Sequence, residues 1–138
     1  RAGPDAALPP LLGRTLAAGQ RAVVLCGSPE RVAALDAALW ACESPDWLPH
    51  GAEGGPDAEL QPIWLTTTPG APNGARFLFL VEIGTTPPLD GFDRVFDLFD
   101  GNNDEAVAAA RRRWTAAKAE GHALTYWQQG PGGWAKKG

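Results

Sequence analysis

A chain of 138 residues in which 44% are hydrophobic and 20% are charged is long enough for one domain with a buried core. No stretch approaches the roughly 20 consecutive apolar residues of a membrane-spanning helix, and the first residues show no signal-peptide pattern, so we expect a cytoplasmic protein. The net charge of −4 argues against tight, nonspecific binding to nucleic acid, because that affinity comes from cations that contact phosphates.

The charges are unevenly distributed along the chain. Residues 1–105 contain six of the 12 basic residues and 15 of the 16 acidic ones, which gives a net charge of −9. Residues 106–138 contain the other six basic residues and one acid, Glu120, which gives +5. A positive segment on an acidic body suits a small acidic partner. Chance clustering in a solvated helix and tail explains the same numbers.

The first part of the chain predicts a strand between two helices. Residues 4–19 have the apolar spacing of an amphipathic helix. Residues 21–26 are a continuous apolar run, as expected for a strand that is covered on both faces. Ser28 and Pro29 suit the N-cap and first turn of a second helix, which extends to about Ala41. This order of strand, turn and helix is the repeating unit of a parallel α/β sheet.

The middle of the chain predicts a long loop followed by several strands. Proline, glycine and acidic residues dominate residues 43–61, which indicates a surface loop whose ordered part is residues 47–50. Strands are expected at residues 62–66, 76–83 and 94–99, and a short docked strand at residues 124–127. The pattern predicts a single three-layer α/β domain over residues 1–129, with a mainly parallel or mixed sheet. It is Rossmann-like but has no nucleotide motif, and a mobile tail is expected at residues 130–138.

The strongest helix signal covers residues 104–121, where Asp104 suits an N-cap and Gly121 suits the stop. At about 100° per residue, four side chains fall within roughly 60° of one another around the helix axis. This stripe consists of Val107, Arg111, Trp114 and Lys118. Arg112 and Arg113 project away from it.

Two interpretations of the stripe stay open from periodicity. In the first, Val107 and Trp114 belong to the core while Arg111 and Lys118 extend from its edge, and apolar spacing alone favours this one. In the second, the stripe is the rim of an apolar slot beside fixed cations. Such a rim suits a peptide that carries both carboxylates and a hydrophobic side chain.

An enzyme is the alternative to a binding protein. Cys26 ends a predicted strand just before a helix N-terminus, where a thiolate is stabilised, and Arg31 follows it. Cysteine-based phosphatases have five residues between these two, whereas this chain has four, one of them a proline. The alternative function is thus a small cysteine-dependent α/β hydrolase or phosphatase, although the spacing differs from the phosphatase pattern. The structural interpretation is that Cys26 is simply a small buried residue at the end of a strand.

Cofactor and metal motifs are not found. Gly27 stands without the further glycines of a nucleotide-binding loop. His50 and His122 have no second ligand at metal-site spacing, so we expect neither a cofactor nor a metal. Cys26 and Cys42 do not make a disulfide framework, which agrees with a reducing compartment.

Several stretches together carry a resemblance to a known family. They are LDAALW at residues 35–40, WLPH at 47–50, VFDLF at 95–99, ARRRW at 110–114 and AEG at 119–121. In this combination and order, the chain resembles the chi subunit of bacterial DNA polymerase III holoenzyme. Members of that family open with a short F-Y-x-L type strand before the first helix, whereas this chain starts at Arg1 without it, which leaves the full strand count of the sheet open.

The resemblance implies a non-catalytic adaptor of the clamp-loader assembly. It implies binding to the acidic-hydrophobic C-terminal tail of single-stranded-DNA-binding protein, a link to the clamp loader through a psi subunit, and a helicase as a further candidate partner. Direct binding to nucleic acid or membrane is not expected. The family's tail pocket falls on Trp40, Trp47, Phe99, Arg111 and Trp114. Lys118 is expected to replace family cations that are Val107 and Thr115 here.

Overall fold

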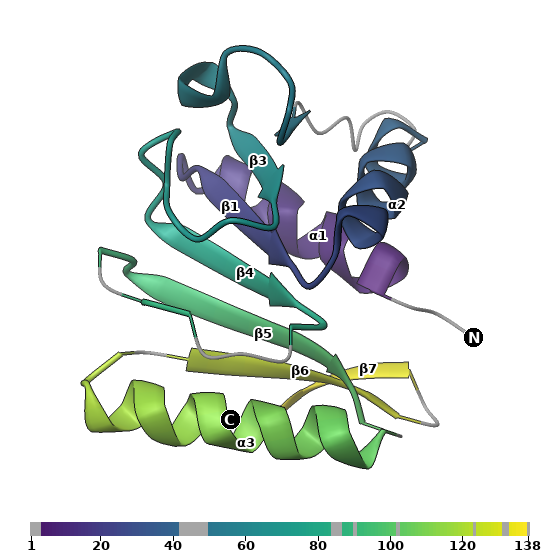
Figure 1. Ribbon diagram of the computed structural model, residues 1–138, viewed down its shortest axis with the longest axis vertical. Coiled ribbons are helices and arrows are strands. Elements are labelled where there is room, and N and C mark those ends of the chain that lie inside the picture. Colours follow the sequence, from purple (N-terminus) through teal and green to yellow (C-terminus); the bar gives the residue numbers. More distant parts are fainter. Residues whose placement is uncertain are drawn as a thin grey trace.

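The computed structural model describes residues 4–41, 50–83, 87–89, 91–101, 103–122, 124–130 and 133–137. These residues form three α-helices, one short 3-10 helix and seven strands (Figure 1). In chain order the elements are α1 (Pro4–Ala17), β1 (Ala22–Cys26), α2 (Pro29–Trp40), β2 (Gly51–Ala52), η1 (Ala58–Leu60), β3 (Ile63–Thr66), β4 (Phe77–Val81), β5 (Arg94–Asp100), α3 (Asp104–Ala119), β6 (Leu124–Gly130) and β7 (Gly133–Lys137).

All seven strands of the described chain belong to one sheet, in the order β2-β3-β1-β4-β5-β6-β7. Every neighbouring pair as far as β6 is parallel, and β7 is antiparallel to β6. Strand β3 lies on one side of β1, and the next strand along the chain, β4, lies on the other side of β1. The winding of the sheet therefore reverses between β1 and β4. The predicted α/β class with a mainly parallel, mixed sheet is confirmed.

The helices form two outer layers around the sheet. Helices α1 and α2 cover one face and α3 covers the other (Figure 1). Because side chains alternate along a strand, Val24 packs with Leu12 of α1 and Leu35 of α2, whereas Val23 belongs to the opposite cluster with Ala117 of α3. Both faces of β1 are therefore buried, which explains its continuous apolar sequence.

Two segments differ from the sequence-based expectation. Residues 130–138 were expected to form a tail, but Gly133–Lys137 pairs with β6 as strand β7. The loop predicted at residues 43–61 contains β2 and η1, which are too short to give a periodic pattern. Its residues 43–49 lie outside the described part.

The ends of β1 and β4 touch at the reversal of the sheet. A Cβ atom built on Gly27 would lie 2.6 Å from the backbone oxygen of Glu82, so the approach requires glycine. Glu82 itself has a left-handed backbone with φ of 53°. Its carboxylate lies 2.8 Å from the guanidinium group of Arg31 on α2. A backbone contact and an ion pair thus join the two strand ends.

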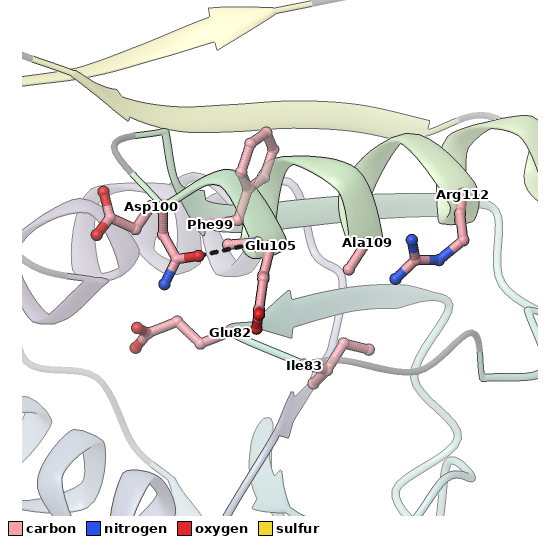
Figure 2. Close-up of a pocket in the computed structure, with 9 residues that line it drawn as sticks. Glu82, Ile83, Phe99, Asp100, Glu105, Ala109 and Arg112 are labelled. Atoms are coloured by element: carbon pink, nitrogen blue, oxygen red, sulfur yellow. Dashed lines mark hydrogen bonds between the residues drawn. The ribbon is translucent and has the colours of Figure 1, made fainter.

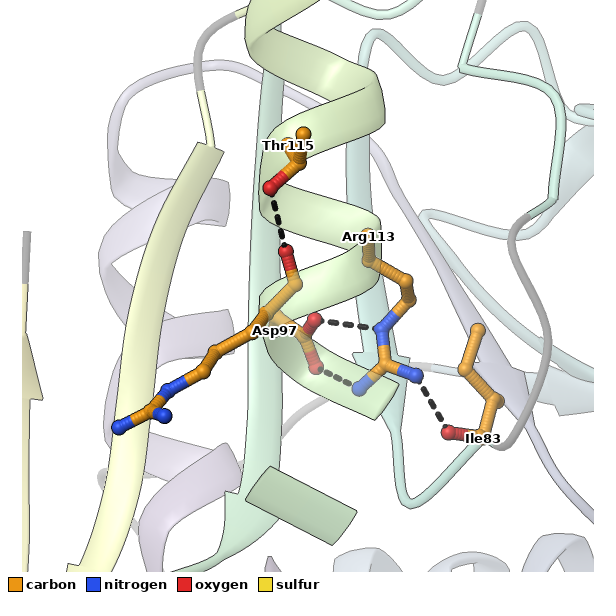
Figure 3. Close-up of polar contacts among 5 residues, drawn as sticks. Ile83, Asp97, Arg113 and Thr115 are labelled. Carbon is orange, nitrogen blue, oxygen red and sulfur yellow. Dashed lines mark hydrogen bonds and ion pairs between the residues drawn. The ribbon is translucent and has the colours of Figure 1, made fainter. Parts of the chain in front are cut away.

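Helix α3 is tied to the sheet by a buried ion pair (Figure 3). Arg113 is only 2% exposed, and its Nε and Nη2 atoms donate to the two carboxylate oxygens of Asp97 on β5 at 2.6 and 3.0 Å. Its Nη1 donates to the backbone oxygen of Ile83 at 2.6 Å. Burial raises the pKa of the Asp97 carboxyl, and the hydrogen bonds from Arg113 oppose that shift. One side chain therefore joins α3, β5 and the segment after β4.

We expect Gly27→Ala to destabilise the protein by about 1–3 kcal/mol, because the added methyl group meets the backbone of Glu82. Gly13→Ala is the matched control: it lies inside α1 with no atom near the added Cβ, and it should stabilise by about 0.5–1 kcal/mol. Urea denaturation of both variants checks the opposite signs. Equal stability of the two variants would contradict the close approach.

We expect Arg113→Ala to destabilise the protein by about 3–5 kcal/mol, because it leaves the Asp97 carboxylate buried without a partner. Arg112→Ala, the exposed neighbour, should change the free energy of unfolding by less than about 0.5 kcal/mol. Thermal and urea denaturation measure both. A double variant with Asp97→Leu and Arg113→Met should be less destabilised than Arg113→Ala, because it leaves no unpaired charge in the core. If Arg113→Ala destabilised the protein less than Arg112→Ala does, the ion pair would not hold α3 on the sheet.

Candidate functional site

Helix α3 begins with a side-chain cap one residue earlier than predicted. Asn103 has an extended backbone, and its Oδ1 accepts a hydrogen bond from the backbone nitrogen of Ala106 at 3.1 Å. Asp104 is therefore the first helical residue rather than the cap, and its carboxylate still favours the positive end of the helix. Gly121, with φ of 80°, follows the end of the helix as expected.

The face of α3 that packs on the sheet is made mostly of alanine. The buried positions are Ala109, Ala110, Arg113 and Ala117. Trp114 is 38% exposed and Val107 is half-buried, so the interpretation that these two form the core is wrong. Small side chains let the helix axis lie close to the sheet, and the larger residues then fall on the flank. The predicted stripe lies at the surface.

The cations of α3 are available for a ligand. The Lys118 ammonium group lies 4.7 Å from the centroid of the Trp114 ring, a cation–π contact. Within the described residues, the guanidinium groups of Arg111 and Arg112 have neither a hydrogen bond nor an ion pair. Both line a shallow, largely apolar depression of about 410 Å³ over Thr115, Ala116 and Ala119. Sequence reasoning had set Arg112 aside because it lies off the Trp114 stripe.

Phe99 belongs to a different pocket, although Arg112 lines both this pocket and the depression. It is buried on β5 and lines a pocket of about 350 Å³ at the carboxyl ends of β4 and β5 (Figure 2). Three carboxylates, from Glu82, Asp100 and Glu105, lie around this pocket, and Arg112 lies at its other end (Figure 2). An acidic peptide would be repelled from most of this pocket.

Trp40 lies in the opposite layer of the molecule. It is at the end of α2, is 59% exposed, and has its ring centroid 4.5 Å from that of His50. The Nε2 atom of His50 is 3.0 Å from a carboxylate oxygen of Asp36, which fixes the ring. Because α2 and α3 cover different faces of the sheet, the structure does not bring Trp40 and Trp114 together. Trp47 lies outside the described residues.

The surroundings of Cys26 do not favour a nucleophile. Its side chain is buried, and this burial raises the pKa of the thiol to about 12, although the charge of Arg31 acts in the opposite direction. At neutral pH the group is a thiol, which is a poor nucleophile. The described residues contain no group of three side chains that suits a metal ion, and none of their helices is long and apolar enough to span a membrane.

Comparison with known proteins assigns the chain to a family. The family model of the DNA polymerase III chi subunit, HolC, matches residues 1–125, which include every element from α1 to α3. A search of curated proteins found no match. The match extends over most of the 138 residues, and the chain belongs to the DNA polymerase III chi subunit family.

Proposed function

We propose that this protein is a non-catalytic replication adaptor that binds the acidic-hydrophobic C-terminal tail of single-stranded-DNA-binding protein on helix α3. The observation that carries the proposal is the exposed contact between Trp114 and Lys118 beside Arg111, whose guanidinium group has no partner among the described residues. Membership of a polymerase III accessory family supports a replication partner.

The chemistry of α3 matches the two properties of such a tail. The exposed ring of Trp114 provides contact area for a terminal hydrophobic side chain, and the depression beside Arg111 adds apolar surface at Ala116 and Ala119. The planar fork of Arg111 suits a carboxylate, which it binds through two charge-assisted hydrogen bonds. Arg112 lines the same depression, where it suits an acidic residue further up the tail.

Charge distribution favours α3 over the rest of the surface for this ligand. Residues 106–138 carry +5, whereas residues 1–105 carry −9. Three of the cations in residues 106–138 are exposed on α3, namely Arg111, Arg112 and Lys118, whereas Arg113 is neutralised by Asp97. Attraction by this segment accelerates the encounter with an acidic peptide. Ordering a flexible tail consumes part of the interaction energy, so the dissociation constant is on the order of micromolar.

An adaptor needs a second surface, and Trp40 offers one. An exposed tryptophan whose ring neighbour is held by Asp36 is a rigid anchor for a protein contact. It lies in the layer opposite α3, so a partner there leaves the tail site free. We assign this surface to a psi subunit or another clamp-loader component, with a helicase as a competing partner. This assignment moves Trp40 out of the tail site.

A cysteine-dependent hydrolase is the weaker candidate. The thiol of Cys26 has a pKa of about 12 and is buried, so it lacks both the thiolate and the access that nucleophilic attack requires. The ion pair between Arg31 and Glu82 also engages the cation that would bind a phosphate.

We expect Arg111→Ala to weaken binding of an acidic peptide ending in phenylalanine by about 1.5–3 kcal/mol, the range for a hydrogen bond to a charged group. Isothermal titration with the full chain measures the affinity. Arg76→Ala is the control, because it removes one exposed positive charge that is paired with Asp93 at the start of β4. An equal loss in both variants would indicate diffuse charge attraction, and unchanged affinity for Arg111→Ala would reject the site.

We expect the isolated protein to bind bare single-stranded DNA negligibly at about 150 mM salt, because most of the chain is acidic and phosphate contacts weaken as salt rises. It should associate with an oligonucleotide only after single-stranded-DNA-binding protein has coated it. Fluorescence anisotropy with a labelled oligonucleotide compares the two conditions. Low-micromolar affinity for the bare oligonucleotide would refute an adaptor that acts only through protein contacts.

A further inference from the structure

A second cationic groove lies on the sheet face opposite α3. It has a volume of about 320 Å³ and lies between helix α1 and the first residues of β4 and β5. Leu11, Arg14 and Thr15 form its helix wall, and Phe77, Arg94 and Phe96 form its strand wall. Its lining is mainly apolar, and the described residues that line it include no carboxylate.

Aromatic rings hold one of its two cations in place. The Arg94 guanidinium carbon lies 5.2 Å from the centroid of Phe96 and 5.9 Å from that of Phe77. Phe96 in turn stacks on the buried Phe79 at 4.5 Å between centroids. Arg94 is thus positioned by cation–π contacts rather than by an acid, and its hydrogen-bond donors stay available.

The two arginines of this groove differ from the ion-paired arginines of the chain. Arg31, Arg76 and Arg113 each form an ion pair with a carboxylate. Arg14 and Arg94 are exposed, and among the described residues their guanidinium groups have no ion-pair or hydrogen-bond partner. Two unpaired guanidinium groups beside an apolar groove, in a protein of net charge −4, are complementary to an anionic ligand.

We propose that this groove binds an acidic peptide segment of a partner protein, with Arg14 and Arg94 on its carboxylates and one hydrophobic side chain between Leu11 and Phe77. The face of Phe96 is already covered by Phe79 and Arg94, so a nucleobase cannot stack there as it does on single-strand binders. The acidic body also disfavours a long polyanion. This site is independent of α3 and lies on the other face of the sheet.

The test is a titration of the ¹⁵N-labelled full chain with the capped peptide Asp-Glu-Leu-Phe-Asp-Asp, acetylated and amidated. We expect saturable shifts of the Thr15, Phe77 and Arg94 amide signals. Arg94→Gln should weaken binding in the groove roughly tenfold, as for the loss of a charge-assisted hydrogen bond. Arg111→Ala should leave the groove affinity within about twofold, because α3 lies on the other face. Arg14→Gln, on the exposed side of α1, repeats the test with a second side chain.

Three results would overturn the proposal. Shifts confined to α3 would show that the groove does not bind the peptide. Unchanged groove affinity in both Arg94→Gln and Arg14→Gln would show that the arginines do not recognise it. Shifts of the same groove amides by an oligothymidylate at lower concentration than the peptide would assign the groove to nucleic acid instead.

Discussion

The buried ion pair between Arg113 and Asp97 is the constraint on which the rest of the molecule depends. Two charges in the core are stable only together, so neither residue tolerates the loss of the other. The pair also sets the rotation of α3 about its axis. Once Arg113 points into the sheet, the helical repeat of about 100° per residue turns Trp114 to the flank and Arg111 to the solvent. A core contact thus determines which side chains the surface presents.

Local patterns predicted most of the fold. The strand predicted at residues 21–26 and the helix predicted at residues 104–121 are confirmed, apart from the exact cap, because each depends only on neighbouring residues. Strand β7 was missed because its sequence, rich in glycine and lysine, has no alternation. The sequence does not predict that Trp40 and Trp114 lie on opposite faces of the sheet, because residue spacing within a helix does not say which face the helix covers.

The three consecutive arginines of α3 show where sequence reasoning about the site ends. Arg111, Arg112 and Arg113 are chemically identical, and only the fold separates two exposed cations from one buried partner of Asp97. Net charge by segment is similarly incomplete. It located the cations of α3, but it hid Arg94, which belongs to the acidic part of the chain and lines a groove together with Arg14.

The contact of Gly27 with Glu82 has a consequence for what this fold is used for. Open, doubly wound sheets bind nucleotides in the crevice where their winding reverses, with phosphates at a glycine turn and a helix N-terminus. Here a backbone oxygen abuts the glycine, and the Glu82 carboxylate already neutralises Arg31. A phosphate would have to break that ion pair and then face a negative charge. The sheet instead separates the surfaces that we propose for protein contacts, because they lie on its two faces.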